Sequence, residues 1–153
     1  MNLVSVVVPY FKKREFIEKS INSIKYQTHK KLEIIIVYDD KDHSDLKLIN
    51  KIKNTDKRIK LIINKKTLGA GKSRNIGIQK AKARYIAFLD ADDFWKKNKI
   101  EQQLKFMMKN DLKISHTSYE VLKGNQKSKK IMKAKTFKDF KKLLLSCNIG
   151  LST

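Results

Sequence analysis

The sequence contains a single cysteine, Cys147, a single proline, Pro9, and only four arginines among its 36 basic residues. One cysteine excludes an internal disulfide framework, and its apolar neighbours predict that Cys147 packs as a small hydrophobic side chain in a reducing compartment. No apolar run is long enough for a signal peptide or a membrane span, since the N-terminal run covers only residues 3–8. We therefore expect a cytoplasmic protein.

The scarcity of arginine changes what the high positive charge indicates. The formal net charge of +21 comes almost entirely from lysine, whereas base readout and bidentate phosphate contacts favour arginine. Scattered lysines create a diffuse positive field that attracts polyanions and permits peripheral contact with the anionic inner face of a membrane. A compositional bias toward lysine, isoleucine and asparagine explains the charge at least as well, so nucleic acid is not an expected partner.

Two kinds of apolar pattern alternate along the chain of 153 residues, whose 41% hydrophobic content suffices for one domain with a sizeable core. Buried strands are predicted over residues 3–8, 33–37, 58–63 and 84–90. Amphipathic helices are predicted over residues 15–27, from a cap at Ser44 to residue 52, and over residues 73–83. This order indicates an α/β fold with a mainly parallel sheet and helices on both faces.

The part of the chain after the fourth strand has a weaker pattern. Apolar residues predict a helix through Ile100, Leu104, Met107 and Met108. We then expect a strand over residues 113–122, a polar loop without structure of its own over residues 123–130, and a closing helix over residues 137–147.

The fourth strand ends in three carboxylates within four positions, Asp90, Asp92 and Asp93. Short carboxylates suit Mg²⁺ or Mn²⁺, which are often shared with substrate phosphates. An acidic turn that begins a helix explains the same residues equally well. In parallel sheets ligands bind beyond the carboxyl ends of the strands, where Pro9, Asp39 and Asp90 are all expected.

The segment from Gly69 to Ser73 ends in the Gly-Lys-Ser of a phosphate-binding loop. The complete pattern requires a glycine five residues before Gly71, and Lys66 stands there. An ATPase is therefore disfavoured, although Lys72 beside a helix N-terminus can still attract an anion.

Five motifs together resemble those of a family 2 glycosyltransferase with a GT-A fold. They are VSVVVPYF at 4–11, QT at 27–28, EIIIVYDD at 33–40, Gly69 with RNIGI at 74–78, and YIAFLDADD at 85–93. The resemblance implies a Rossmann-like GT-A domain that binds a nucleotide-sugar donor and occupies residues 1–153. It also implies that the chain stops short of the acceptor half.

The resemblance assigns the nucleobase pocket to the ends of the first two strands. Pro9 and Phe11 match positions that form this pocket, where the Phe11 ring would pack against a uracil; alternatively, both simply end a strand. Asp39 matches the carboxylate that accepts a hydrogen bond from the base, and Asp40 is the alternative if the register slips by one. The common Asp-Asp-Gly-Ser pattern is absent here, because Lys41 follows the two aspartates.

Three further residues match positions around the ribose and the diphosphate. Arg74 matches an arginine that contacts the nucleotide, and the alternative is an arginine on a helix surface. Asp90 resembles the residue that faces the ribose. Asp92 resembles the direct ligand of the Mn²⁺ or Mg²⁺ that bridges the diphosphate, whereas we expect Asp93 to cap the following helix.

The implied reaction is inverting transfer of a sugar from a nucleotide donor, with a UDP-sugar favoured, to a glycan or lipid-linked acceptor in lipopolysaccharide or capsule synthesis. Inversion requires a general base, which the family usually supplies from a downstream acidic motif. Neither Glu120 nor Asp139 sits in such a motif, so the sequence identifies no base. The alternatives are a non-catalytic nucleotide-sugar-binding fragment and, less favoured, a basic nucleic-acid-binding protein.

Overall fold

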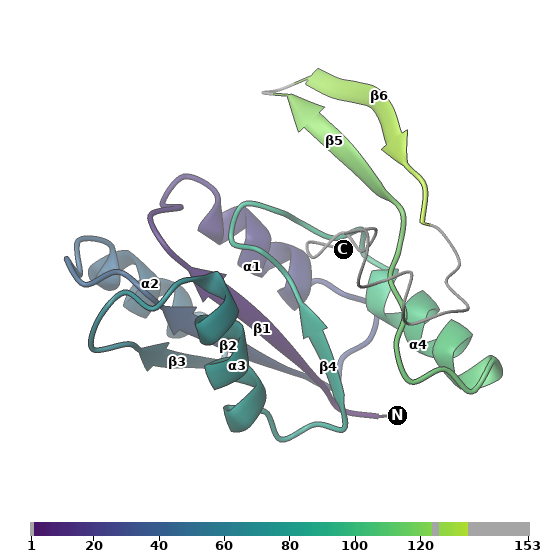
Figure 1. Ribbon diagram of the computed structural model, residues 1–153, viewed down its shortest axis with the longest axis horizontal. Helices are drawn as coiled ribbons and strands as arrows, with labels where there is room; N and C mark the ends of the chain where they lie inside the picture. The colour runs from purple at the N-terminus through teal and green to yellow at the C-terminus, as the bar shows by residue number, and fades with distance from the viewer. Residues whose placement is uncertain (1, 124–125, 135–153) are drawn as a thin grey trace. The chain divides into compact units, whose positions relative to one another are not determined.

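The computed structural model describes residues 2–123 and 126–134 (Figure 1). The chain divides into two compact units, Met1–Glu101 and Gln102–Thr153. The first unit holds a four-stranded sheet in the order β3-β2-β1-β4, and the second holds a two-stranded sheet of β5 and β6. Within the described residues, no helix is both long enough and apolar enough to span a bilayer.

The first unit alternates strands and helices as the sequence predicts. Its elements are β1 (Val4–Tyr10), α1 (Ile17–Lys25), β2 (Leu32–Tyr38), α2 (Leu46–Lys53), β3 (Ile59–Ile63), α3 (Ala70–Lys80) and β4 (Tyr85–Phe88). Neighbouring strands are all parallel (Figure 1). The predicted parallel α/β sheet is therefore confirmed.

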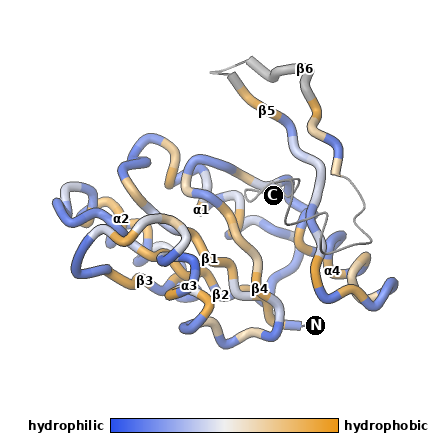
Figure 2. The backbone as a smooth tube through the Cα atoms, viewed as in Figure 1, coloured by the Kyte–Doolittle hydropathy of each residue, from blue (hydrophilic) through white to orange (hydrophobic). Residues whose placement is uncertain are grey.

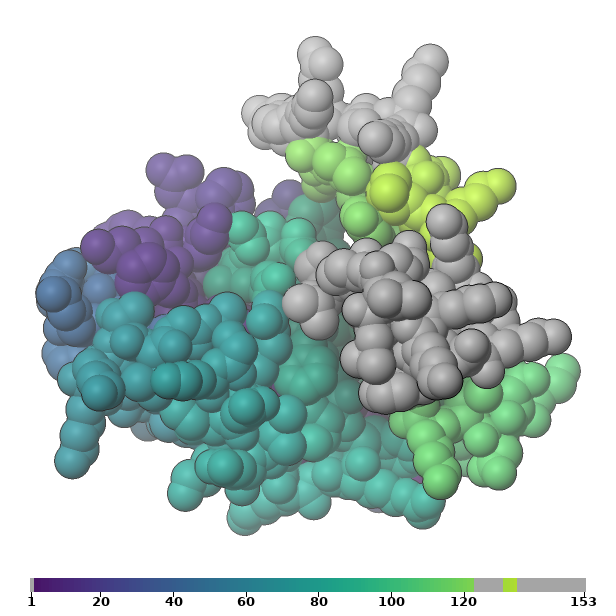
Figure 3. Space-filling view, in the orientation of Figure 1, coloured from purple at the N-terminus to yellow at the C-terminus, as the bar shows by residue number. Residues whose placement is uncertain are grey.

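The strand order explains how helices come to lie on both faces of this sheet. The chain moves from β1 to β2 to β3 in one direction, and then crosses back to place β4 on the far side of β1. Because such crossovers are right-handed, α1 and α2 lie on one face and α3 on the other. Figure 1 shows α3 in front of the strands, and Figure 3 shows that its segment covers them.

Alternate residues of the central strands β1 and β2 are buried on opposite faces of the sheet. Val7, Ile35 and Val37 form a buried cluster against which Ile76 of α3 packs. Successive side chains of a strand point to opposite faces, and those of the other face are equally buried: Val6, Val8, Ile34 and Ile36. Burial on both faces accounts for the mainly apolar colouring along β1 and β2 in Figure 2.

Gly77 allows α3 to approach β1 closely. A Cβ atom at this position would lie 2.2 Å from Cγ1 of Val7, a separation at which the two atoms would overlap. The glycine therefore sets how near the helix lies to the strand, and with it the position of the residues at the start of α3.

Pro9 lies inside β1, which ends at Tyr10, later than predicted. On one side β1 pairs with β4 only up to Val7, whose carbonyl accepts the Leu89 N–H at 3.2 Å. Because alternate residues of a strand direct their N–H groups to the same neighbour, the N–H that proline lacks would point beyond the end of β4. The proline therefore removes no hydrogen bond from the sheet.

Two helices in the first unit begin differently from the prediction. Asp45, and not Ser44, is the N-cap residue of α2, and its side chain makes no capping bond, because its carboxylate binds Tyr10 and Arg14 instead. Phe16 precedes α1 and is 47% exposed, so it does not belong to the buried face.

Helix α3 starts three residues before the predicted position and ends earlier. Gly69 is its N-cap residue with φ of 87°, a value that favours glycine. Lys72, which the sequence predicts just before the helix, therefore lies in its first turn together with Ser73. The helix ends at Lys80 because the next segment is bound elsewhere. The Lys82 N–H donates to Glu33 at 3.0 Å and the Ala83 N–H donates to Ser5 at 3.2 Å.

The elements after β4 are α4 (Lys99–Lys109), β5 (Tyr119–Lys123) and β6 (Gln126–Met132). The helix is confirmed, but the strand predicted over residues 113–122 forms only at its end. The loop predicted over residues 123–130 is wrong, since β6 pairs antiparallel with β5. Main-chain groups make these ladder bonds, so a lysine-rich composition does not prevent them. The helix predicted over 137–147, with Cys147, lies outside the described residues.

Candidate functional site

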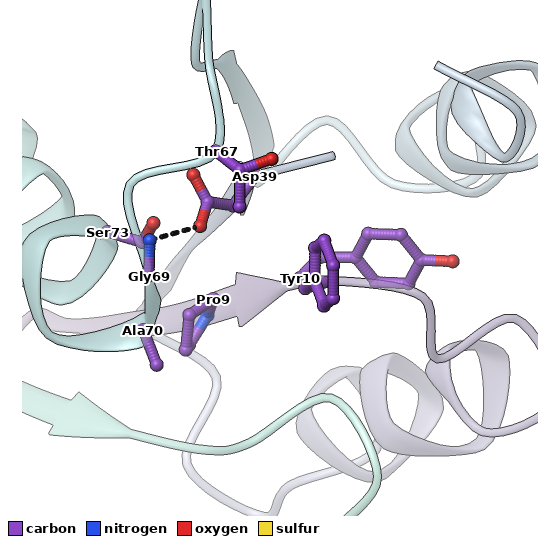
Figure 4. Close-up of a pocket in the computed structure, with 8 residues that line it drawn as sticks. Pro9, Tyr10, Asp39, Thr67, Gly69, Ala70 and Ser73 are labelled. Atoms are coloured by element: carbon purple, nitrogen blue, oxygen red, sulfur yellow. Dashed lines mark hydrogen bonds between the residues drawn. The ribbon is translucent and has the colours of Figure 1, made fainter. Parts of the chain in front are cut away.

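A cavity of about 230 Å³ opens where β1 and β2 end and α3 begins (Figure 4). It is lined by Pro9, Tyr10, Phe11, Asp39, Thr67, Gly69, Ala70 and Ser73. This is the edge of a parallel sheet at which ligands usually bind. The structure therefore brings together the three residues predicted for a nucleobase pocket, and the Phe11 ring remains 45% exposed there.

The carboxylate of Asp39 holds the loop between β3 and α3 in place. Asp39 is 2% exposed, and its Oδ1 accepts hydrogen bonds from Asn64 Nδ2 at 2.7 Å and from the Leu68 N–H at 2.8 Å. Its Oδ2 accepts one from the Gly69 N–H at 2.7 Å, drawn in Figure 4. A carboxylate oxygen can accept two hydrogen bonds, so Oδ2 retains capacity for a ligand donor.

Asp40, the alternative to Asp39, does not line the cavity. Its Oδ1 accepts the Asp42 N–H at 3.1 Å. Its Oδ2 is buried, and no partner for it lies in the described part of the chain. The geometry of the cavity therefore favours Asp39 of the two.

Next to the cavity, which Tyr10 helps to line, a hydrogen-bond network around the buried Asp45 ties the loop after β1 to the loop after β2. The Tyr10 hydroxyl donates to Asp45 Oδ2 at 2.7 Å, Arg14 Nη1 donates to Oδ1 at 2.8 Å, and the Asp45 N–H donates to the Tyr38 hydroxyl at 3.2 Å. The bond from Tyr10 lowers the pKa of Asp45 despite its burial, while burial raises the pKa of Tyr10. Figure 4 accordingly shows the Tyr10 ring directed away from Asp39.

The sequence did not predict this network, although each of its residues lies in or near one of the motifs at 4–11 and 33–40. Tyr10 and Asp45 are 35 positions apart, and hydrophobic periodicity carries no information about which polar side chains meet. A buried tyrosine needs a partner for its hydroxyl, and this requirement was the one signal available.

Arg74 of α3 meets Asp90 beyond the end of β4. Their Nη2 and Oδ1 atoms lie 2.5 Å apart, and the side chains are 15% and 30% exposed. Arg74 Nε is buried, and no acceptor for it lies among the described residues. Leaving such a donor unpaired is costly, so a ligand oxygen at this point would be stabilising.

Asp92 pairs with Lys13 from the loop after β1. Lys13 Nζ lies 2.8 Å from Asp92 Oδ2, and both side chains are partly exposed. The hydrogen bond with Asp92, followed by the charges of Asp92, Asp90 and Asp93, raises the pKa of Lys13. The acidic segment therefore already holds one positive charge, that of Lys13.

The prediction that Asp93 caps the following helix is wrong. Helix α4 begins only at Lys99, and the Asp93 N–H instead donates to the Asp90 carbonyl at 3.0 Å in a turn. The intervening segment first runs along α1, where the Trp95 N–H donates to Ser23 Oγ at 3.1 Å. Because this segment is bound to α1, helix α4 begins only after it, at Lys99.

The residues present fit a divalent cation that shares its ligands with a substrate. In the described ranges no three His, Cys, Asp or Glu side chains gather into a closed metal site. Mg²⁺ needs no such cage where phosphates and water supply most ligands. The Lys13 ammonium, 2.8 Å from Asp92, already shows a cation held at this carboxylate.

No general base is assigned. Glu120 lies in β5, in the second unit, and Asp139 lies outside the described residues.

The chain belongs to the family described as Glycosyl transferase family 2, which it matches over residues 5–151. It is 35% identical, over 99% of its length, to the UDP-Glc:alpha-D-GlcNAc-diphosphoundecaprenol beta-1,3-glucosyltransferase WfgD of Escherichia coli, and covers 58% of that protein. It is 38% identical, over 78% of its length, to the putative teichuronic acid biosynthesis glycosyltransferase TuaG of Bacillus subtilis, and covers 48% of it. The chain thus spans about half the length of these relatives.

Solved structures confirm the GT-A fold. Residues 1–349 of S. aureus TarS, in complex with UDP-GlcNAc, match with a TM-score of 0.62 and 24% identity, over 71% of this chain and 32% of that one. The mannosyltransferase PcManGT from Pyrobaculum calidifontis, in complex with GDP-Man and Mn²⁺, matches with a TM-score of 0.65 and 18% identity, over 80% of this chain and 36% of that one.

Proposed function

We propose that residues 1–153 form the donor-binding domain of an inverting glycosyltransferase that uses a nucleoside diphosphate sugar, preferably a UDP-sugar. The observation that carries the proposal is the convergence at one sheet edge. Pro9 and Asp39 line a cavity next to Ser73, and the neighbouring Arg74 is ion-paired with Asp90. A nucleotide has a flat base, a polyhydroxyl ribose and an anionic diphosphate, and this edge offers groups suited to each.

In this proposal the base enters the cavity. The exposed face of Phe11 packs against the base, and Pro9 forms one wall. Asp39 Oδ2, which accepts one hydrogen bond from the Gly69 N–H, accepts another from a base N–H. Asp39 also holds the β3–α3 loop in place. The same carboxylate therefore both fixes the shape of the pocket and recognises the base.

The ribose and the diphosphate lie toward the end of β4. Asp90 accepts hydrogen bonds from ribose hydroxyls, and the buried Arg74 Nε donates to a nucleotide oxygen. Asp92 is the protein ligand of Mn²⁺ or Mg²⁺. When bound, the cation offsets negative charge on the departing nucleoside diphosphate.

The proposed acceptor is a lipid-linked or surface glycan, of the lipopolysaccharide or capsule type. The names of the two relatives support this class, since one acts on a diphosphoundecaprenol-linked sugar and the other is assigned to teichuronic acid synthesis. We place the protein in the cytoplasm, where its net charge of +21 favours peripheral contact with an anionic membrane surface.

Calorimetric titration of UDP, with and without Mn²⁺, tests the donor site. We expect binding that requires the cation and that is lost in Asp92→Ala. Glu18→Ala is the matched control, because it removes an exposed carboxylate from α1 and should leave binding unchanged. GDP and dTDP, titrated in parallel, identify the base. Failure of all three nucleotides to bind in the presence of Mn²⁺ would contradict the proposal.

A second candidate is a nucleotide-sugar-binding module without transferase activity. It is favoured by one observation, that no general base is assigned among the described residues. Hydrolysis or transfer of a UDP-sugar by the chain, abolished in Asp92→Ala, would exclude it. Nucleic-acid binding, the third possibility, predicts affinity that falls steeply with salt and survives the same substitution.

A further inference from the structure

Three consecutive basic residues follow β1, and each one pairs with a different carboxylate. The pairs are Lys12 with Asp42 at 3.4 Å, Lys13 with Asp92 at 2.8 Å, and Arg14 with Asp45 at 2.8 Å. Asp42 and Asp45 both belong to the segment between β2 and α2. Of the three pairs, only that of Lys13 reaches the acidic segment after β4.

The local backbone directs Lys13 toward this segment. Lys12 has φ of 48°, an uncommon value that turns the chain sharply. The Lys13 carbonyl then accepts the N–H groups of Phe16 and Ile17, both at 3.1 Å, at the start of α1. The main chain of Lys13 is thus held at the start of the helix, while its side chain is 45% exposed.

The Lys13 ammonium lies against the carboxylate proposed to hold the donor's cation. Its partner Asp92 is the proposed metal ligand, and the neighbouring Asp90 is engaged by Arg74. The ammonium lies against Asp92 Oδ2, and a divalent ion bound to the same carboxylate would lie within a few ångströms of it, where like charges repel. A cation therefore binds Asp92 more tightly once the Lys13 ammonium has moved away.

We propose that Lys13 is an internal competitor for the divalent cation, and that it makes cation binding depend on the nucleotide. A divalent ion without nucleotide competes with the Lys13 ammonium, and the protein offers it only the Asp92 carboxylate as a ligand. An ion that arrives with a nucleoside diphosphate also brings phosphate oxygens, to which the released Lys13 binds. This inference rests on the proposed donor site and adds to it a residue that couples the two ligands.

The first test measures Mn²⁺ binding without nucleotide, by the electron paramagnetic resonance signal of the free ion. Lys13→Met should bind Mn²⁺ about two- to fivefold more tightly than the unmodified chain, the range expected for removal of a partly exposed ion pair. Lys12→Met removes the same charge one residue away and should change the affinity much less. Asp92→Ala combined with Lys13→Met should lose the gain.

The second test repeats the titration with UDP. In the unmodified chain UDP should increase the Mn²⁺ affinity, and in Lys13→Met this increase should be smaller by at least the same two- to fivefold factor. Lys13→Gln should behave like Lys13→Met, and the circular dichroism spectra of all variants should match.

The inference is overturned if Lys13→Met and Lys12→Met bind free Mn²⁺ alike, if the gain persists without Asp92, or if the effect of UDP is unchanged. The proposed function fails in a different measurement, namely the absence of any nucleotide binding by the unmodified chain. The comparison of Lys13→Met with Lys12→Met needs no nucleotide, so the two failures are distinguishable.

Discussion

The two ends of the parallel sheet both carry carboxylates, but they use them differently. At the amino end Glu33 is 6% exposed and accepts hydrogen bonds from the Ser5 hydroxyl at 2.5 Å, the Lys82 N–H at 3.0 Å and the Lys60 ammonium. Burial alone would raise the pKa of Glu33, but the bonds from Lys60 and Ser5 outweigh it and lower the pKa. This carboxylate fastens the connection between α3 and β4.

At the carboxyl end the polar groups retain hydrogen-bonding capacity. Asp39 Oδ2 accepts one bond from the Gly69 N–H, Arg74 Nε has no acceptor among the described residues, and Asp92 is 39% exposed beside Lys13. Neither burial nor the number of protein hydrogen bonds distinguishes Glu33 from Asp39, since each is buried and accepts three. The difference is that Asp39 lines the cavity, whereas Glu33 does not, and for this reason we propose Asp39 as the ligand-binding carboxylate.

The substitution with the largest expected effect disturbs both ends together. Gly77→Ala places a Cβ 2.2 Å from Val7 Cγ1 and should destabilise the protein by about 3 kcal/mol, because α3 must move away from β1. Urea denaturation measures this loss, and UDP affinity should fall too, since α3 carries Arg74. Gly71→Ala is the control: nothing lies within 4 Å of its Cβ, so stability should be unchanged or higher. Equal stabilities of the two variants would contradict the packing argument.

The next substitution should affect only the amino end of the sheet. Glu33→Gln replaces an acceptor oxygen with an amide group that faces existing donors, and it should cost about 2 kcal/mol of unfolding free energy. UDP affinity should remain that of the unmodified chain, because the nucleotide is proposed to bind at the opposite end. A loss of affinity in the folded variant would show that the two ends are not independent.

A third variant should affect only the carboxyl end. Arg74→Lys keeps a positive charge near Asp90 but removes the Nε donor and the planar fork. We expect UDP affinity to fall about tenfold, or about 1.4 kcal/mol, with a smaller change in thermal stability. Arg84→Lys, at an exposed arginine before β4, should leave UDP binding intact. Unchanged UDP affinity in the Arg74→Lys variant would show that Arg74 does not contact the nucleotide.

The smallest effect concerns pH. The pKa of Asp45 is lowered in the folded chain, so its contribution to stability is complete above its ordinary pKa of about 4 and is lost as the pH falls through the folded value. As the pH falls from 5 to 2, the free energy of unfolding should therefore decrease less in the Asp45→Asn variant than in the unmodified chain. The difference in slope should be well below about 1.4 kcal/mol per pH unit, the limit for one proton.

Urea denaturation at a series of pH values measures this slope. Asp42→Asn is the control, because the Asp42 side chain is 53% exposed and its loss should hardly alter the acid dependence. Identical slopes for Asp45→Asn and the unmodified chain would show that the Tyr10–Asp45 bond does not contribute to acid unfolding.

The sequence by itself determined the alternation of strands and helices, the parallel sheet and the family. These depend on local periodicity and on motifs within single segments: the β-branched run of β1 reports burial on both faces wherever the strand is placed. The predictions were wrong where the local pattern is weak. Examples are β6, whose pairing is made by main-chain groups, and the first turn of α3, which begins at Ala70.

Only the tertiary structure decided which polar side chains meet. Tyr10 with Asp45, Lys13 with Asp92, and Arg74 with Asp90 are contacts between segments that the strand order β3-β2-β1-β4 brings together at one edge. Hydrogen bonds and ion pairs act over a few ångströms, whereas these partners lie in different motifs of the chain. Their pairing follows from the folded arrangement of the strands and loops, and no spacing within the sequence encodes it.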